Sequence, residues 1–421
     1  MNTEPLLTFN AGSSTLKIGL FAVGTAGTRR LGKGTIDFRR TPLRLLLGGG
    51  SSTLDIALQA GAHEDTEKVM TEVLDRLTEH FDLGRMAAAG HRVVHGGDLF
   101  DGPVRLDDHA LRGIEQLVAL APLHQPQALR VIRALRNLQP RLPQTVSFDT
   151  VFHRTHADVV RRFAIPRALH DQGVKRYGFH GLSYKFIAGE LARRIPGLAS
   201  GRIVAAHLGS GASLCGLSDG LSRDTSMGFS ALDGVPMASR CGAVDPGVLL
   251  HLIGTRGLSV TDVEDILYRQ SGLLGVSGIS ADSRELLKHE RLEARQALDL
   301  FTFRIAGEVA RLSNTLGGLD ALVFTAGVGE NQPPIRAEVG RRLGWLGLQL
   351  DDQANAANAM RISNASSRVA AFVIATDEEQ VIADEAASVL DLGGPSVRRG
   401  ATSEQPGPAG RHFRRASPGS F

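Results

Sequence analysis

The sequence predicts an α/β fold built as two related halves, and three observations support it. The chain has 421 residues, which is longer than one ordinary domain. Short apolar runs alternate with amphipathic helical patterns along most of its length. A short motif also recurs at an offset of 197 residues, since Gly12-Ser13 matches Gly209-Ser210 and Gly19-Leu20 matches Gly216-Leu217. The repeat predicts two related halves, each with a glycine-serine turn that faces a ligand held between the halves.

Each expected element follows from a local pattern. Apolar runs bounded by small residues indicate strands, and apolar residues at spacings of three and four indicate helices. In the first half, these patterns predict strands at 6–10 and 15–23, helices near 65–81, 107–120 and 126–138, and strands near 86–94 and 143–149. In the second half, they predict a helix near 183–195, a strand at 202–208, helices near 246–269 and 291–316, a buried strand at 320–326 with a loop at 327–331, a helix at 333–343, a strand at 369–375 and a helix at 378–391.

Composition and charge exclude several classes of protein. With 42% hydrophobic and 22% charged residues, the chain resembles a soluble globular protein. Five arginines and one acid lie in 393–421, a Gly/Pro/Ser/Arg-rich tail that we expect to be disordered. The net charge is +3, so the rest of the chain sums to about −1, which argues against nucleic-acid binding.

Three further features predict a cytoplasmic location. No apolar run approaches the roughly 18 residues that a membrane span needs. The first residues lack the pattern of a signal peptide. The two cysteines, Cys215 and Cys241, form no C-x-x-C motif, which suits a reducing compartment and excludes a disulfide scaffold or a cysteine zinc site.

The glycine-serine turns are suited to binding phosphate. Small residues at a strand end let backbone N–H groups converge on an anion. Hydroxyls of Ser13, Ser14 and Thr15 add donors, and Lys17 adds a charge on the same face as Thr15. One such turn alone would be an ordinary hairpin, but a third Gly-rich segment at 327–331 follows a buried strand. The motifs of P-loop NTPases and zincin proteases are both missing from the sequence.

A second set of residues is suited to anions. Arg92, His124, His180 and Arg240 all lie in Gly-rich or loop segments. Any one of them could be a surface arginine or a satisfied core histidine, so the argument depends on the set. Glycine at a strand end permits close approach of a ligand, so we expect these side chains to face a cleft.

Several segments of the sequence resemble those of the acetate kinases. Its two signature-like segments are Asn10-Ala-Gly-Ser-Ser-Thr-Leu-Lys17 and Asp224-Thr-Ser-Met-Gly-Phe229 through Arg240-Cys-Gly242. Further segments match in order: Gly90-His-Arg-Val-Val-His-Gly-Gly97, Ala121-Pro-Leu-His124, Phe148-Asp-Thr150, Arg176-Tyr-Gly-Phe-His-Gly181, Gly272-Leu-Leu-Gly-Val-Ser-Gly278 and Phe324-Thr-Ala-Gly-Val-Gly-Glu-Asn331. The resemblance covers roughly residues 5–390 and is highly specific.

The resemblance implies a fold and an assembly. It implies two related actin-like, ribonuclease H-like domains that close over a nucleotide cleft, as in sugar kinases and heat-shock chaperone ATPases. The expected domains are 1–150, joined by a C-terminal helix at about 379–392, and 151–378, which binds the nucleotide. Members of this family are homodimers that act on a small carboxylate and a nucleotide.

The resemblance also assigns roles to residues. The catalytic set would be Asp149, His180, Arg240 and Arg92. The substrate-binding set would be Arg92, Val94, Leu123, Phe179 and His124. ATP, the co-substrate, would contact Lys17, Ser13, Thr15, His207, Leu208, Gly209, Ser210, Gly211, Asp282, Ser283, Arg284, Gly327, Val328, Gly329, Glu330 and Asn331. Asn10 and Glu378 would support Mg²⁺, with Mn²⁺ as an alternative.

These residue types fit phosphoryl transfer on chemical grounds. The reaction needs positioning and charge neutralisation more than covalent help. Acetate is already ionised at neutral pH, so its oxygen needs no general base. We therefore expect Asp149 to orient a metal-bound water or an arginine. Guanidinium groups suit planar carboxylate and phosphate groups better than ammonium groups do.

The sequence departs from the usual family pattern at six positions: Leu182, Tyr184, Ser210, Ala231, Ser283 and Asp377. The primary hypothesis is reversible transfer from ATP to acetate, giving acetyl phosphate and ADP. Ala231 stands where a proline would help wall the methyl pocket, which motivates a propionate or other short-chain carboxylate kinase. A third hypothesis is a nucleotide-binding protein of the same fold without kinase activity, and it is motivated by Ser210, Leu182 and Tyr184.

Overall fold

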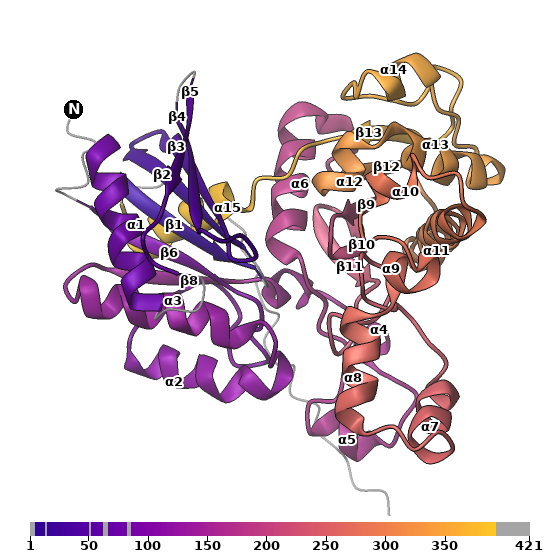
Figure 1. The fold of residues 1–421 in the computed structure, drawn as a ribbon. Coiled ribbons are helices and arrows are strands. Elements are labelled where there is room, and N and C mark those ends of the chain that lie inside the picture. The colour runs from indigo at the N-terminus through magenta and orange to yellow at the C-terminus, as the bar shows by residue number, and fades with distance from the viewer. Residues whose placement is uncertain (1–4, 13–14, 50–51, 62–65, 82–85, 393–421) are drawn as a thin grey trace, which may run out of the picture.

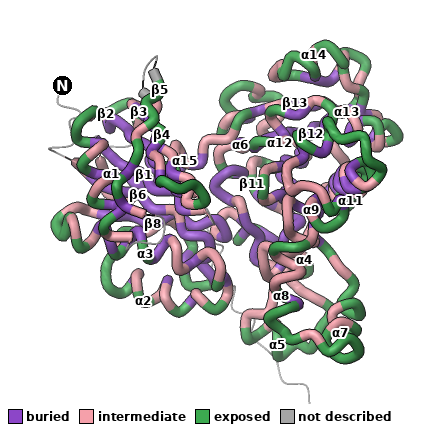
Figure 2. The backbone as a smooth tube through the Cα atoms, in the orientation of Figure 1, coloured by how far each residue is buried: buried purple, intermediate pink, exposed green. Residues whose placement is uncertain are grey.

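The computed structural model describes residues 5–12, 15–49, 52–61, 66–81 and 86–392. Ser13, Ser14 and the tail at 393–421 lie outside the described residues, so the expectations for them stay untested. Two β-sheets form the centres of two halves, drawn in indigo to purple and in magenta to orange in Figure 1. Figure 2 shows buried residues concentrated in these sheets. Among the described residues, no helix is long and apolar enough to cross a membrane.

The first sheet has the strand order β5-β4-β3-β2-β1-β6-β8-β7. Its strands are β1 (Pro5–Ala11), β2 (Thr15–Gly24), β3 (Gly27–Asp37), β4 (Arg44–Gly49), β5 (Ser52–Ala57), β6 (Ala88–Val93), β7 (Val104–Arg105) and β8 (Gln144–Phe148). β1 pairs antiparallel with β2 and parallel with β6, and β6 pairs parallel with β8. The carboxyl ends of β1, β6 and β8 therefore meet at one edge of the sheet, where ligands bind in open α/β sheets.

The second sheet has the order β11-β10-β9-β12-β13. Its strands are β9 (Ile203–Leu208), β10 (Ala212–Ser218), β11 (Leu221–Thr225), β12 (Ala321–Thr325) and β13 (Ala370–Val373). β9 pairs antiparallel with β10 and parallel with β12, which pairs parallel with β13. This repeats the order and directions of β3-β2-β1-β6-β8. Gly12 and Gly209 both follow the first strand of their sheet, so the repeat in the sequence reflects a repeated topology.

Helices cover both faces of each sheet, because alternate strand residues are apolar on both sides. In the first half these are α1 (Thr66–His80), α2 (Asp108–Gln116) and α3 (Gln125–Leu138). In the second half they are α4 (Asp158–Arg161), α5 (Arg167–Asp171), α6 (Gly181–Arg194), α7 (Pro246–Gly254), α8 (Val260–Arg269), α9 (Gly272–Ser277), α10 (Ser283–Leu286), α11 (Leu292–Leu316), α12 (Ala326–Asn331), α13 (Pro333–Arg342) and α14 (Asp352–Ala356). The last helix, α15 (Glu378–Val389), returns to pack against β1, β2, β3, β6 and β8 of the first sheet.

Two predictions of local structure were wrong. The single helix expected near 246–269 is the pair α7 and α8, because Gly257 has a φ of 70° and Ser259 starts a new helix. The Ser259 Oγ accepts a hydrogen bond from the Asp262 backbone N–H at 3.1 Å, as a helix cap does. The loop expected at 327–331 lies within the short helix α12.

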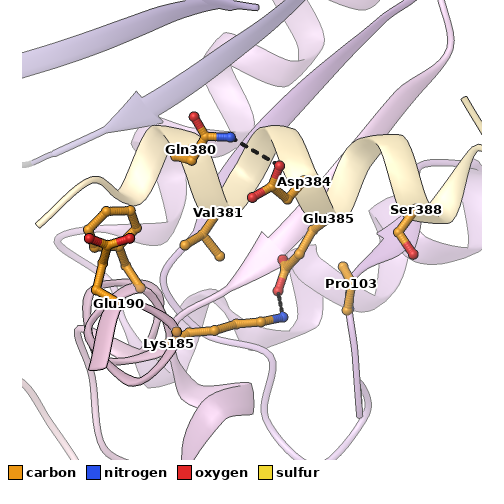
Figure 3. A pocket seen from close by; sticks show the side chains of 10 residues that line it. Pro103, Lys185, Glu190, Gln380, Val381, Asp384, Glu385 and Ser388 are labelled. Carbon is orange, nitrogen blue, oxygen red and sulfur yellow. Dashed lines mark hydrogen bonds and ion pairs between the residues drawn. The ribbon is translucent and has the colours of Figure 1, made fainter. Parts of the chain in front are cut away.

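Two helices join the halves, and each begins at a residue predicted to be functional. α6 starts directly after His180, and α15 starts at Glu378. They pack against each other through Leu182, Val381 and Ile382. A pocket of about 390 Å³ lies beside this contact, where Lys185 of α6 pairs with Glu385 of α15 at 2.5 Å (Figure 3). The helix pair therefore fixes His180 and Glu378 relative to each other across the two halves.

Candidate active site

Three strands of the first sheet end at the same edge, and each places a polar side chain there. Asn10 lies at the end of β1, Arg92 near the end of β6, and Asp149 directly after β8. The Arg92 Nε and Nη2 donate to the two oxygens of Asp149 at 3.0 and 2.5 Å. The Arg92 Nη1 donates to Asn10 Oδ1 at 3.1 Å. The two hydrogen bonds to Asp149 fix the plane of the Arg92 guanidinium.

Burial is the strongest influence on the Arg92–Asp149 pair. It raises the pKa of Asp149, and the neighbouring guanidinium opposes that rise. Burial alone would lower the pKa of Arg92, but Asp149 and Glu378 raise it above its ordinary value. Arg92 is therefore firmly charged, and the Asp149 carboxylate serves as its partner rather than as a free base.

The N-terminus of α15 adds two carboxylates to this edge. The Asn10 Nδ2 donates to Glu378 Oε2 at 2.8 Å and to Glu379 Oε1 at 2.7 Å. Burial would raise the pKa of Glu378, but Arg92 and Lys17 outweigh it and hold that pKa at about 2. Lys17 lies opposite Asn10 on the neighbouring strand and is exposed. The site thus combines an ionised carboxylate with an accessible ammonium group.

The donor set around Glu378 fits Mg²⁺ that arrives with a nucleotide. Carboxylate oxygens are the ligands that Mg²⁺ prefers, and this ion keeps waters and phosphate oxygens in its shell. Among the described residues, no group of three or more His, Cys, Asp or Glu side chains is placed to hold a metal alone. The Asn10 oxygen already accepts a hydrogen bond from Arg92, so Glu378 would be the direct ligand and Asn10 would support it.

The second half contributes two stacked histidines. The rings of His180 and His207 lie 4.2 Å apart at 15°. His180 adopts a left-handed conformation with a φ of 57° at the start of α6. Burial lowers the pKa of His180 well below 6.5 and that of His207 to about 4. Both rings are therefore neutral at pH 7.

Gly181, the residue after His180, has to be a glycine. A Cβ there would lie 1.8 Å from the backbone oxygen of Asp149. The close approach brings the start of α6 onto the end of β8 and so places His180 beside Asp149.

Burial of many histidines makes stability sensitive to acid. Their pKa values fall to about 4 or below, so the folded state binds fewer protons than the unfolded state between about pH 4 and 6.5. These residues are His91, His95, His124, His153, His156 and His207. At pH 5.5 we expect each to lower the free energy of unfolding by roughly 1.4 kcal/mol relative to pH 7.5. Urea unfolding at the two pH values measures this, and an equal free energy at both would contradict it.

Arg240 reaches the same region from a loop of the second half. A Cβ on Gly211 would lie 3.3 Å from His180 Nε2 and 3.7 Å from Arg240 Nη1, so both side chains lie close to this turn. The Arg240 Nη1 donates to the Ala231 backbone oxygen at 3.2 Å. Burial, aided by repulsion from Arg92, lowers the pKa of Arg240. Within the described part of the chain no carboxylate pairs with Arg240, so its charge is available to an anion.

An apolar cluster borders these cations. Val94 and Phe179 are buried in one cluster, against which Ala231 packs. Leu123 and His124 are half-buried in the neighbouring loop. Burial, with Arg240 and Arg92 nearby, lowers the pKa of His124 to about 3. A short carboxylate placed here would have its charge on the arginines and its carbon chain among apolar side chains.

The predicted nucleotide residues are only partly brought together. Leu208 ends β9, and Gly209–Gly211 form the turn to β10, closed by a hydrogen bond from Gly209 N–H to the Gly211 oxygen at 3.1 Å. Ser210 is exposed there, and Thr15 accepts from Gly12 in the matching turn of the first half. Asp282 and Arg284 form an ion pair with each other at 2.5 Å, and Ser283 between them is buried. Within the described residues, the hydrogen bonds and ion pairs of these three residues stay within 280–287.

The third Gly-rich segment has a structural role. Glu330 Oε1 accepts from the backbone N–H groups of Ala326 at 2.8 Å and Thr376 at 3.1 Å. Asn331 donates to the Gly327 oxygen at 2.9 Å within the same turn that contains Val328 and Gly329. Glu330 therefore ties the end of β12 to the segment that leads into Glu378.

Several departures from the family pattern have structural partners in this chain. Leu182 packs in the contact between α6 and α15. Asp377 caps α15 by accepting from the Gln380 N–H at 3.0 Å, and it pairs with Arg30. Tyr184 is fully buried, with its hydroxyl 2.5 Å from the Ser213 Oγ.

Two residues of the site were missed from the sequence. Glu379 could have been found as the second acid at a helix start. Ser213 could have been found as the small polar residue that closely follows the second glycine-serine turn.

Comparison with known proteins identifies the family of this chain. The sequence profile of the Acetokinase family matches residues 5–384. The chain is 45% identical over 401 residues to an acetate kinase of Rhodopseudomonas palustris, covering 93% of this chain and 100% of that one. The crystal structure of Porphyromonas gingivalis acetate kinase is 32% identical, with a TM-score of 0.81 and coverage of 92% and 100%. A propionate kinase from Francisella tularensis is 35% identical, with a TM-score of 0.84 and coverage of 91% and 98%. The chain belongs to the acetokinase family.

Proposed function

We propose that this protein is an acetate kinase, which transfers the γ-phosphoryl group of ATP directly to acetate in a reversible reaction. The observation that supports this best is the convergence of Arg92, Arg240 and His180 beside an apolar cluster. The two arginines can neutralise a small carboxylate and a phosphoryl group there, and the apolar side chains can contact the short carbon chain of the carboxylate.

In the proposed reaction an acetate oxygen attacks the γ-phosphorus while the bond to the ADP oxygen breaks. No proton moves, because acetate is ionised and ADP leaves as an anion. Arg92, held flat by Asp149, and Arg240 neutralise the carboxylate and the phosphoryl oxygens. His180 donates a hydrogen bond to the transferred group.

Mg²⁺ would neutralise the nucleotide phosphates, with Glu378 and Asn10 supporting it and Lys17 near the phosphates. Mn²⁺ is the alternative ion. The proposed domains are 1–150, which α15 joins, and 151–378. The need for ATP supports the predicted cytoplasmic location.

The test is release of ADP that requires both Mg²⁺ and a carboxylate. We expect turnover with acetate and none without a carboxylate or with EDTA present. Binding of ATP without turnover on any short carboxylate would contradict the proposal and favour the non-kinase reading.

A second candidate activity is phosphorylation of propionate. The observation that favours it is the small side chain of Ala231, which packs against the cluster that contains Val94 and Phe179. A larger kcat/KM for propionate than for acetate would favour this activity.

We also propose a homodimer formed through α7. This helix has no buried residue, although Val248, Leu250 and Ile253 are apolar and exposed by 45%, 73% and 41%. It packs with α8, which exposes Val260 by 70%. An apolar surface of this kind needs a partner, and a second copy of the chain supplies a matching one.

Substitution Leu250→Glu should break the proposed dimer, because it places a charge in the centre of that apolar surface. Light scattering on a size-exclusion column should give twice the chain mass for the unaltered protein and the chain mass for the variant. The control Leu99→Glu changes an exposed leucine elsewhere and should leave the mass unchanged. A dimeric Leu250→Glu variant would contradict this interface.

A further inference from the structure

A chain of buried polar groups stands behind His180. The His180 Nδ1 lies 2.8 Å from the Ser213 Oγ, and the Tyr184 hydroxyl lies 2.5 Å from the same oxygen. Ser213 belongs to β10 and Tyr184 to α6, and both are fully buried. The Nδ1 side of the His180 ring is thus held by Ser213 of the second sheet and, through Ser213, by Tyr184 of α6.

The direction of the hydrogen bonds follows from the protons available. Burial raises the pKa of Tyr184 well above 10, so it keeps its proton. Among the described residues, the Ser213 Oγ is the acceptor available to this buried hydroxyl, so the tyrosine donates its proton there. Ser213 then has its own single proton for His180 Nδ1.

This direction decides where His180 carries its proton. Burial keeps the ring neutral, so an accepting Nδ1 requires the proton on Nε2. Nε2 faces the turn at Gly211, where the Arg240 guanidinium also ends. A donor N–H therefore points to the place where the transferred phosphoryl group is expected.

We propose that Tyr184 and Ser213 are positioning residues that hold His180 in its Nε2–H tautomer, so that the histidine donates to the transferred phosphoryl group. The part concerning the phosphoryl group rests on the proposed function. The tautomer itself does not.

The first test removes one hydroxyl at a time. Tyr184→Phe should lower kcat about tenfold, with KM for ATP and acetate changed less than twofold, because one neutral hydrogen bond is lost behind the ring. Ser213→Ala should lower kcat further. The matched control Tyr177→Phe removes a hydroxyl that donates to the Gly173 oxygen, and it should retain the original kcat. An unchanged kcat in both Tyr184→Phe and Ser213→Ala would overturn the proposal.

The second test reads the proton directly, by nitrogen NMR of the protein labelled with ¹⁵N-histidine. The His180 signal is assigned by its loss in His180→Asn. We expect the proton on Nε2 in the unaltered protein and a mixture of tautomers in Ser213→Ala. A proton on Nδ1 in the unaltered protein would overturn the proposal. An Nε2–H signal in a protein that phosphorylates no carboxylate would support the tautomer and contradict the proposed function.

Discussion

Replacing Arg240 with alanine should lower kcat for acetyl phosphate formation by about 10³-fold, while the protein stays folded. An arginine that neutralises a transferred phosphoryl group contributes a factor of this size. Arg240 has no carboxylate partner among the described residues, and its neighbour Arg92 repels it. Removing its charge therefore leaves no buried acid unpaired, and the melting temperature should not fall.

The control for this experiment is Arg341→Ala, which removes an arginine that is 69% exposed and pairs with Glu338. It should keep the original kcat. If Arg240→Ala retains more than a tenth of the activity, Arg240 does not neutralise the transferred group. If it unfolds, the argument about its unpaired charge is wrong.

Asp149→Asn should lower kcat/KM for acetate by about 10²-fold and also destabilise the fold. The amide cannot accept both guanidinium bonds, so Arg92 loses its fixed orientation. Arg92 is only 13% exposed, so loss of its partner should lower the free energy of unfolding by about 2–4 kcal/mol. Steady-state kinetics and urea unfolding measure the two effects.

The matched control is Asp108→Asn at the ion pair with Arg136, where Asp108 is 73% exposed and both effects should be small. The pH profile separates positioning from base catalysis. Because Asp149 accepts hydrogen bonds from both Nε and Nη2 of Arg92, we expect the rate of the unaltered protein not to depend on deprotonation of Asp149. A rate that rises with pH and loses that dependence in Asp149→Asn would identify Asp149 as a general base instead.

The parts of the fold that depend on local pattern were predictable. The strand that ends at Asn10 and the one that ends near Arg92 are short apolar runs followed by small residues. The resemblance to the acetate kinases, rather than the strand pattern, assigned Asn10, Arg92 and Asp149 to one site, and in the structure they meet where parallel strands end. The 197-residue repeat indicated the second sheet for the same reason.

The features that were missed depend on contacts distant in sequence. Strands β3, β4 and β5 escaped notice because charged and glycine residues interrupt their apolar pattern, as at Arg29, Arg30 and Gly32. The break between α7 and α8 requires the backbone conformation of Gly257, which the apolar periodicity around it conceals. The contact of Tyr184 with Ser213 joins α6 to β10, and no local pattern reports such a pair.

The most direct test of the central claim is to trap the product with hydroxylamine. The protein is incubated with ATP, Mg²⁺ and one of formate, acetate, propionate or butyrate, and the hydroxamate formed is measured. The arrangement of Arg92, Arg240 and His180 beside a small apolar cluster predicts an acyl phosphate with a maximum at acetate. A maximum at propionate or butyrate would contradict the assigned substrate and point to the room beside Ala231. No hydroxamate with any of the four, while ATP still binds, would contradict phosphoryl transfer to a carboxylate at this site.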